Sequence, residues 1–424
     1  MTRMKESGID WIGQIPEEWE VAKVNHIFEE HKQKNRGNKE KNLLSLSYGR
    51  IIQKSIDSFF GLLPESFDTY NIIQRGDIVL RLTDLQNDKR SLRVGLAREN
   101  GIITSAYLTL RLKNLESNDS YMYYLLHTYD ICKVFYNFGG GVRQGGTWSD
   151  IYKMELLNPP CNEQQKIADF LDKKTAQLDK VKGLLEEQIQ KLKDYRASLI
   201  YETVTKGLDK TVSMKDSGID WIGQVPQRWG VKAIKYIFDE IGSGSTPKSD
   251  NEIFYDGDIN WIQSGDLYQT DTVTSVSKTI SYQGFNSTSA LKIYQPPFVA
   301  LAMYGASVGN VAVSYIDACV NQAVVVMLGA SEKVRFGKYA IEASKNNLIF
   351  SAQGGTQPNI SQNLIKNWSI PQPKNEEQEQ IADFLDEKTV QIDKLIQIKN
   401  KQIENINKQR QTLIFDYVTG KRRV

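Results

Sequence analysis

The chain has 424 residues, of which 40% are hydrophobic and 25% charged, and its formal net charge is +2. This length predicts two to four domains with more than one hydrophobic core. No apolar run approaches the roughly 20 residues that a membrane span requires, so we expect a soluble globular protein. The near-neutral charge does not by itself indicate a non-specific nucleic-acid binder.

The number and spacing of the cysteines indicate the redox compartment of the protein. Cys132, Cys161 and Cys319 are odd in number and widely spaced, which argues against a disulfide framework and for a reducing compartment. The amino-terminal MTRMKESGID has no apolar segment behind its basic residues, so we expect no secretory signal. These features predict a cytoplasmic protein.

A sixteen-residue phrase opens the chain and returns near its middle. MKESGIDWIGQIPEEW occupies residues 4–19, and MKDSGIDWIGQVPQRW occupies residues 214–229. A second phrase, QKIADFLDKKTAQLDK at 165–180, returns as QIADFLDEKTVQIDK at 380–394. The chain is therefore expected to consist of two halves, each a module followed by the same kind of tail.

The first module contains three apolar runs that predict strands. These are GDIVLRL (76–82), RVGLA (93–97) and SAYLTLRL (105–112), each bounded by Gly, Asp or Asn. The stretch 121–138 then predicts a helix. The module closes on Gly-Gly-Thr at 145–147 and on the prolines of 158–160, where proline favours the end of one element and the start of another.

The first tail predicts a long coiled-coil helix. It carries leucines at intervals of seven, with Val181 and Tyr195 three residues beyond two of them. The stretch from Glu163 to Lys206 would form a rod of roughly 65 Å at about 1.5 Å per residue. The predicted seam consists of Leu171, Leu178, Leu185, Leu192 and Leu199.

The second half repeats this order. Its predicted strands are 298–304, 311–315 and 321–328, and its predicted helix is 337–350. Gly-Gly-Thr at 354–356 and the prolines of 370–373 again precede a tail. The seam of that tail is predicted at Leu385, Ile392, Ile403, Ile406 and Leu413.

These elements predict an α/β fold with two globular modules and two long helices. The predicted segments are a first recognition module at 1–160, a spacer helix at 161–207, a second module at 208–374 and a second helix at 375–424. Each amphipathic helix needs a partner for its apolar stripe. Since a module lies between the helices in the chain, we expect them to pair antiparallel and to relate the halves by a pseudo-two-fold axis.

This set of motifs, in this order and over nearly the whole chain, resembles the specificity subunit of type I restriction-modification systems. The resemblance implies two target recognition domains that each read one half of a bipartite, asymmetric sequence in double-stranded DNA. It also implies docking of two methyltransferase subunits and of restriction (translocase) subunits. S-adenosylmethionine, ATP and Mg²⁺ would then be bound by those partners and no cofactor by this chain.

Enzyme motifs are incomplete in this sequence. The segment 158–161 (NPPC) resembles the (D/N)PP(Y/F) motif of adenine-N6 methyltransferases, but Cys161 replaces the aromatic residue. The glycines after Phe138 resemble a cofactor loop, but Val142 replaces its second glycine. No phosphate-binding loop is present, and the three histidines lack metal-ligand spacing. We therefore expect no active site and no metal site, and a hinge at 158–161.

The candidate DNA contacts come from polar loops between predicted strands. Arginine and glutamine can read base edges, and lysine mostly neutralises phosphate. In the second module, Asp239 to Ala330 holds three lysines against nine acidic residues, so the candidates there are polar and glycine-flanked. The candidates are Arg75, Arg81, Lys89, Arg90, Arg93, Arg143 and Gln144 in the first module, and Ser243, Thr246, Lys248, Gln263, Ser264, Tyr304, Ser307, Gln353 and Gln357 in the second.

Two further interpretations concern packing and function class. Trp11, Trp19, Trp221 and Trp229 recur with the opening phrase, which favours packing at the junction of module and helix over base stacking. The alternative function is a non-catalytic, two-headed protein-interaction adaptor spaced by a coiled coil. The acidic second module supports that alternative.

Overall fold

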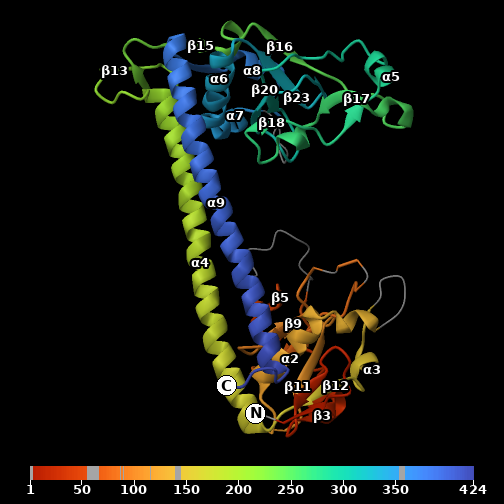
Figure 1. The fold of residues 1–424 in the computed structure, drawn as a ribbon. Coiled ribbons are helices and arrows are strands. Elements are labelled where there is room, and N and C mark those ends of the chain that lie inside the picture. Colours follow the sequence, from red (N-terminus) through yellow and green to blue (C-terminus); the bar gives the residue numbers. More distant parts are fainter. Residues whose placement is uncertain are drawn as a thin grey trace. The chain divides into compact units, whose positions relative to one another are not determined.

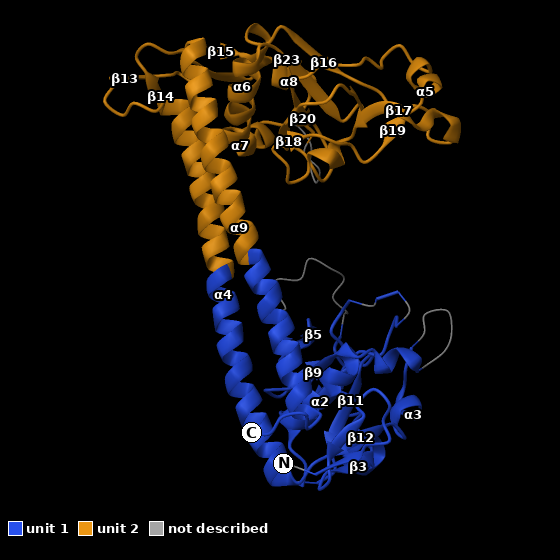
Figure 2. Ribbon diagram, in the orientation of Figure 1, with its two compact units in different colours: residues 1–185, 400–424 blue, residues 186–399 orange. Residues whose placement is uncertain are grey.

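The computed structural model describes residues 3–54, 66–85, 87–88, 90–114, 116–138, 145–352 and 359–424. Two compact units divide the chain: Met1–Leu185 with Asn400–Val424, and Glu186–Lys399 (Figure 2). Each unit thus combines one module with part of both long helices. This division differs from the four consecutive segments predicted from the sequence, because the helices pack with the modules.

The module of unit 1 is built on a four-stranded antiparallel sheet in the order β4-β11-β8-β9 (Figure 1). Its strands are β4 (Phe28–Glu30), β11 (Leu108–Leu112), β8 (Ile78–Leu80) and β9 (Val94–Leu96). Helix α2 (Asp119–Ile131) follows β11 and shares one buried core with the sheet. The Asn118 side chain caps α2 by accepting a hydrogen bond from the Tyr121 amide at 2.8 Å.

Four strand pairs and three short helical elements complete the described part of unit 1. The pairs are β1 (Met4–Glu6) with β2 (Gln14–Pro16), β3 (Glu20–Lys23) with β12 (Glu155–Asn158), β5 (Leu44–Ser47) with β6 (Arg50–Gln53), and β7 (Asn71–Ile73) with β10 (Gly101–Ile103). The helical elements are α1 (Val24–Ile27), η2 (Val134–Asn137) and α3 (Trp148–Ile151).

The module of unit 2 repeats the sheet with one strand added, in the order β16-β23-β20-β21-β18. The strands are β16 (Glu240–Ser243), β23 (Val324–Leu328), β20 (Phe298–Ala302), β21 (Val311–Ser314) and β18 (Thr272–Val273). Strand β18 is parallel to β21, and the other neighbours are antiparallel. Helix α6 (Ser331–Ala343) follows β23 as α2 follows β11.

The remaining described elements of unit 2 surround this sheet. A smaller sheet has the order β19 (Thr279–Ile280), β17 (Tyr255–Ile262), β22 (Cys319–Val320). The outer pairs are β13 (Met214–Asp216) with β14 (Gln224–Pro226) and β15 (Gly230–Ala233) with β24 (Ser369–Gln372). The short helices are α5 (Tyr282–Asn286), α7 (Lys345–Phe350), α8 (Gln362–Asn367), η3 (Ile234–Tyr236), η4 (Glu252–Phe254) and η5 (Ser264–Leu267).

The predicted order of strand, strand, strand and helix is confirmed in both modules, and the helix ends differ. Helix α2 stops at Ile131, because Lys133 adopts a left-handed backbone with φ of 63° and a 3₁₀ turn follows. The second predicted helix, 337–350, is divided into α6 and α7 at Ser344. Both corrections shorten a helix whose apolar spacing continues past its end.

The two tails form single long helices, α4 (Cys161–Lys206) and α9 (Asn375–Val418). In unit 1 the first part of α4 meets the last part of α9, where the Phe170 and Tyr417 ring centroids are 4.5 Å apart. In unit 2 the Lys399 amino group donates to Gln188 Oε1 at 2.6 Å. The helices therefore run antiparallel within each unit, as predicted. No described helix is both long enough and apolar enough to cross a membrane.

The helix seam follows the predicted heptads, but the second set of buried positions in each heptad differs from the prediction. All ten predicted seam positions are buried or half-buried. The companion positions lie four residues after the α4 leucines, whereas Val181 and Tyr195, three residues after, are 46% and 57% exposed. The prediction for Val181 and Tyr195 is therefore wrong, because spacings of four and three alternate along a heptad. The companion row on α4 is Lys182, Ile189, Arg196 and Thr203, and on α9 it is Ile396, Ile403, Arg410 and Tyr417.

The repeated phrase packs each module against the helix ends. Trp19 and Trp229 are buried, and their indole nitrogens donate to Glu163 and Glu377 at 2.9 Å in both units. Gly420 has φ of 72°, and a Cβ there would meet the Trp19 ring at 3.2 Å. Trp11 packs edge-on against Tyr129, and Trp221 stacks on Trp368. The predicted packing role of the four tryptophans is confirmed.

Candidate nucleic-acid interface

The loop between β8 and β9 is organised around a buried arginine. Arg93 is 0% exposed, and its Nε donates to the Tyr136 hydroxyl at 3.0 Å. Its amide donates to Asp130 Oδ2 at 2.6 Å. Its terminal nitrogens donate to four loop carbonyls, so the guanidinium substitutes for the regular backbone pairing that the loop lacks. These acceptors are the carbonyl oxygens of Arg81, Thr83, Asp84 and Asp88.

The prediction that Arg93 lies on an exposed DNA-contacting loop is therefore wrong. Arg75 and Arg90 are exposed, and no described side chain accepts a hydrogen bond from either guanidinium. Arg81 is half-buried and forms an ion pair with Asp88 at 3.5 Å. Arg75 and Arg90 are thus the described arginines of this cluster best placed to meet a phosphate or a base.

Asp88 stays ionised beside these arginines. Hydrogen bonds from the side chain and amide of Ser91 lower the pKa of Asp88 to about 2. Its carboxylate therefore offsets part of the positive charge of Arg81 at neutral pH. Five predicted contacts lie outside the described residues: Lys89, Arg143, Gln144, Gln353 and Gln357.

The first residues of the glycine-rich stretch 242–249 of unit 2 pack against neighbouring strands. Ser243 ends β16, and its hydroxyl donates to the Val324 carbonyl at 3.1 Å. A Cβ on Gly244 would lie 1.7 Å from the Val320 carbonyl oxygen, so only glycine fits there. Close packing on Val320 therefore accounts for glycine at position 244. Thr246 and Lys248 are exposed, and the Thr246 hydroxyl donates to the side-chain oxygen of Gln322.

The other predicted residues of unit 2 are partly enclosed. Gln263 and Ser264 begin η5 and are half-buried, and Gln263 Nε2 is buried without a hydrogen-bond partner among the described residues. Tyr304 is half-buried, and burial raises the pKa of its phenol. Ser307 is only 7% exposed, which contradicts its prediction as an exposed contact.

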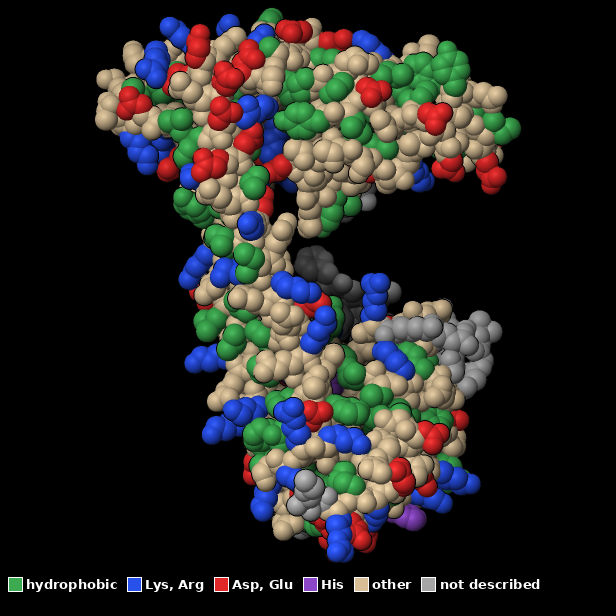
Figure 3. Space-filling view, in the orientation of Figure 1, with side chains coloured by type: hydrophobic (Ala, Val, Ile, Leu, Met, Phe, Trp, Pro, Cys, Tyr) green, Lys and Arg blue, Asp and Glu red, His purple; other side chains and the backbone are tan. Residues whose placement is uncertain are grey.

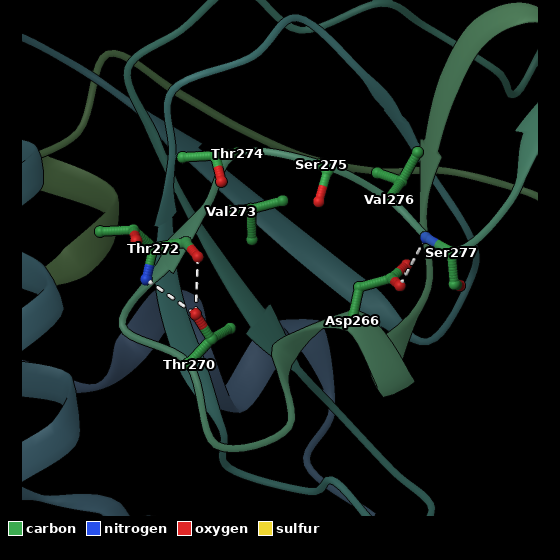
Figure 4. Close-up of a pocket in the computed structure, with 8 residues that line it drawn as sticks. All are labelled: Asp266, Thr270, Thr272, Val273, Thr274, Ser275, Val276 and Ser277. Carbon is green, nitrogen blue, oxygen red and sulfur yellow. Dashed lines mark hydrogen bonds between the residues drawn. The ribbon is translucent and has the colours of Figure 1, made fainter. Parts of the chain in front are cut away.

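A hydroxyl-lined depression lies beside η5 (Figure 4). It encloses about 380 Å³ and is lined by Asp266, Thr270 and the run Thr272 to Ser277 around β18. Asp266 Oδ1 accepts a hydrogen bond from the Ser277 amide at 3.0 Å, and the Thr270 hydroxyl donates to the Thr272 carbonyl at 2.6 Å. Hydroxyl groups can bind phosphate oxygens without carrying charge. Sequence reasoning missed this surface, although the run TDTVTSVSK signals it.

Two acidic residues of the second module, Asp239 and Asp271, pair with cations from outside 239–330. Arg196 of α4 pairs with Asp271 and Glu342, and Lys338 lies 3.0 Å from Asp271. Lys333 similarly lies 3.5 Å from Asp239. In Figure 3, acidic side chains appear at both ends of this module, and basic side chains are spread over unit 1. These pairs offset part of the local excess of acids.

The helices expose matched apolar side chains. Val181 and Leu184 of α4 are 46% and 49% exposed, and Leu395 and Ile398 of α9 are 47% and 48% exposed. These pairs occupy equivalent positions of the two repeats, one in each unit. Exposed apolar side chains that recur at equivalent places indicate a contact surface.

The segment that resembles a methyltransferase motif has a structural role. Asn158 ends β12, and its side-chain oxygen accepts a hydrogen bond from Gln164 Nε2 at 3.0 Å. The same Gln164 nitrogen donates to the Pro159 carbonyl at 2.8 Å, and Gln378 donates to the Pro373 carbonyl at 2.9 Å in unit 2. The segment thus starts α4, as expected for a hinge. Within the described ranges, no group of three or more His, Cys, Asp or Glu side chains could hold a metal ion.

The repeated modules and shared helix pair define a two-module recognition scaffold, and comparisons with known proteins place it in a family. Residues 16–191 and 226–408 match the family described as "Type I restriction modification DNA specificity domain". The chain therefore belongs to the family of type I restriction-modification specificity subunits, with two α/β recognition domains joined by long helices.

Two curated relatives come from Methanocaldococcus jannaschii. The putative type I restriction enzyme MjaX specificity subunit is 24% identical over 97% of this chain and 96% of its own length. The type I restriction enzyme MjaVIII specificity subunit is 26% identical over 97% and 94%. A solved chain from work on complex assembly and conformational transition of the type I R-M system is similar in fold, with a TM-score of 0.69 and 16% identity over 95% of this chain and 98% of that chain.

Proposed function

We propose that this chain reads a bipartite, asymmetric target in double-stranded DNA and docks methyltransferase and restriction subunits, without catalysing a reaction itself. The observation that carries the proposal is the repeat: both units keep the order of four central strands and the tryptophan–glutamate contact with a long helix, while the ion pairs between module and helix differ. The repeated scaffold suits the docking of two identical partner subunits. The different loops suit the reading of two different half-sites.

The surface chemistry of the modules supports DNA reading. The first module presents Arg75 and Arg90 from loops at its sheet, and arginine can bind guanine edges or phosphates. The second presents Thr246, Lys248 and the hydroxyls of the depression, which suit phosphate contacts with less charge. The two half-sites would then be read by different chemistry.

The helices support partner docking. Val181 with Leu184, and Leu395 with Ile398, offer the same apolar pair in each unit. Two copies of one methyltransferase subunit could bury one pair each. S-adenosylmethionine, ATP and Mg²⁺ would be bound by those partners.

Binding measurements on the isolated chain and on its complex with the partner methyltransferase test the proposal. We expect S-adenosylmethionine to bind the complex and not the isolated chain, and we expect the complex to select a split motif from a random duplex pool. Binding of S-adenosylmethionine by the isolated chain would indicate a fused enzyme. A complex that selects no duplex sequence would favour the two-headed adaptor.

Paired helix variants test the docking surface. Val181→Asp with Leu184→Asp should remove the partner from unit 1, and Leu395→Asp with Ile398→Asp from unit 2, so each double variant should bind one methyltransferase subunit instead of two. Ala197→Asp, at another exposed position of α4, is the control. Native mass spectrometry of the complexes gives the stoichiometry, and two bound subunits in both double variants would refute this surface.

A further inference from the structure

A strained tyrosine forms the tip of the β5–β6 hairpin in unit 1. Ser47 pairs with Arg50, so only Tyr48 and Gly49 form the turn. Both have positive φ, 47° for Tyr48 and 75° for Gly49, as in a type I′ turn. The first position of such a turn favours Asn, Asp or Gly, and a bulky side chain there is strained. Tyr48 is therefore an unfavourable residue at this position of the turn.

The turn is held from beneath by α2 and α4. The Tyr123 hydroxyl of α2 donates to the Gly49 carbonyl at 3.2 Å. Arg50 Nη2 forms an ion pair with Asp179 of α4 at 2.5 Å. A Cβ on Gly49 would lie 3.0 Å from Leu92 Cβ, so the backbone also packs closely on the residue before Arg93. The hairpin tip is thus fixed, and Figure 1 shows β5 beside the helices of unit 1.

The Tyr48 side chain contributes nothing to this anchoring. It is 85% exposed and makes no hydrogen bond or ring contact with any residue that the structure describes. An exposed aromatic ring in a strained conformation, without an internal partner, indicates a constraint other than folding.

The charges around the turn are mainly positive. Burial raises the pKa of Tyr123, beneath the turn, against the opposing charges of Arg410, Arg50 and Arg98. The side chains of Arg50 and Arg98 are 61% and 54% exposed, and those of their partners Asp179 and Asp172 are 34% and 39% exposed. With Arg410, the three arginines exceed the two aspartates by one charge. A planar ring among exposed arginines suits a DNA duplex, since the ring can pack on a sugar or on a base edge in a groove while the cations face phosphates.

We propose that the ring of Tyr48 contacts the DNA duplex bound by the first recognition domain, held in place by the Gly49–Tyr123 and Arg50–Asp179 contacts. This inference rests on the proposed function and adds a contact absent from the arginine and glutamine set predicted above. The strained turn fixes the ring at a rigid tip instead of a flexible loop, which limits the ordering cost of binding.

Tyr48→Asn separates binding from folding. Asn-Gly is the favoured sequence for this turn, so the variant should unfold at the same temperature as wild type or higher. Its complex with the partner methyltransferase should bind the target duplex about tenfold more weakly, the size expected for the loss of one contact to a duplex. Tyr48→Phe keeps the ring and should bind within about twofold of wild type, because the contact uses the ring face.

Salt dependence and a matched control define the contact further. Tyr48→Asn should leave the slope of log affinity against log salt unchanged, since no phosphate charge is neutralised by the ring. Tyr236→Asn, at a tyrosine of unit 2 that is 72% exposed, should not alter affinity. The duplex should carry the split motif selected by the wild-type complex.

Three outcomes overturn the inference. Wild-type affinity in Tyr48→Asn would show that the ring does not touch DNA, while the proposed function would stand. Loss of the methyltransferase from that variant, with unchanged DNA binding by the assembled fraction, would assign the ring to a protein contact. A wild-type complex that binds no duplex would overturn the proposed function together with this inference.

Discussion

The two units use one pair of helix residues in opposite ways. Asp179 and Arg410 in unit 1 occupy the same repeat positions as Asp393 and Arg196 in unit 2. In unit 1 the module offers a cation, Arg50, to the helix aspartate.

In unit 2 the module offers anions, Asp271 and Glu342, to the helix arginine. The helix pair has one aspartate and one arginine at these positions in each unit. It can therefore form ion pairs with either basic or acidic side chains of a module. Modules with different loops can therefore be mounted on one scaffold.

The helices that follow the central sheets show the same divergence. Tyr124 of α2 and Tyr339 of α6 are equivalent, since each donates to a helix aspartate, Asp172 at 2.7 Å or Asp386 at 2.6 Å. One turn further on, α6 has Glu342 and α2 has His127. His127 is buried, and both its burial and the charge of Arg410 lower its pKa. Unit 1 therefore has no acidic side chain at this position to pair with Arg410.

The largest contrast is expected from removing the helix arginines. Arg196→Met leaves Asp271 and Glu342 with Lys338 as their remaining cationic partner, and should lower the free energy of unfolding of unit 2 by about 3 kcal/mol. Arg410→Met should cost unit 1 about 1 kcal/mol, because Arg410 lies 3.8 Å from Asp179, which keeps Arg50. Urea unfolding of both variants measures the difference. Equal losses would contradict the asymmetry.

A seam variant tests what both units share. Leu185→Asp places a charge in the half-buried seam and should destabilise the chain by about 3 kcal/mol, with loss of partner assembly. Val181→Asp, at an exposed position one turn earlier, should change stability by less than about 0.5 kcal/mol. Thermal unfolding distinguishes them, and a soluble, assembly-competent Leu185→Asp chain would contradict the seam.

Acid should destabilise unit 1 through His127. Burial and the charge of Arg410 lower the pKa of His127 from 6.5 to about 4, so the unfolded chain takes up the proton first as pH falls. Stability from this group is complete above pH 6.5 and declines toward pH 4, by about 2 kcal/mol between pH 6.5 and 5. His127→Leu should remove that part of the pH dependence in urea titrations. An unchanged pH profile in the variant would contradict the buried neutral histidine.

The smallest expected effect concerns the exposed arginines of the first module. Arg90→Ala should weaken DNA binding by the complex by about 1 kcal/mol and reduce the salt slope by about one. Arg93→Ala should instead lower the unfolding temperature, because Arg93 holds the β8–β9 loop from within. Affinity at several salt concentrations checks both. A lower salt slope in a fully folded Arg93→Ala chain would show that Arg93 meets phosphate.

The order of the central strands and helix along the chain, and the helix pair, could be anticipated because they depend on short-range patterns. Apolar runs bounded by Gly and Asp predicted the central strands, and leucines at every seventh position predicted the seam. The repeated tryptophans predicted packing, since a phrase kept in both halves serves what both halves share. Trp19 and Trp229 confirm this.

The binding surface could be anticipated only in part. Arg93 lies in the same basic run as Arg90, and only the fold shows that one is buried and the other exposed. Arg196 and Arg410 occupy seam positions that charge patterns would assign to the surface. Gly244 reads as a flexible loop residue, but the closeness of Val320 decides its role. Such outcomes depend on contacts between residues distant in sequence.

Methylation profiling of host DNA tests the central claim most directly. Single-molecule sequencing would map N6-methyladenine with the chain present, deleted, and restored, in a strain that expresses the partner methyltransferase. The account predicts methylation at a split motif with an unspecified gap, which disappears on deletion and returns on restoration. A methylome that is the same in all three strains would contradict it.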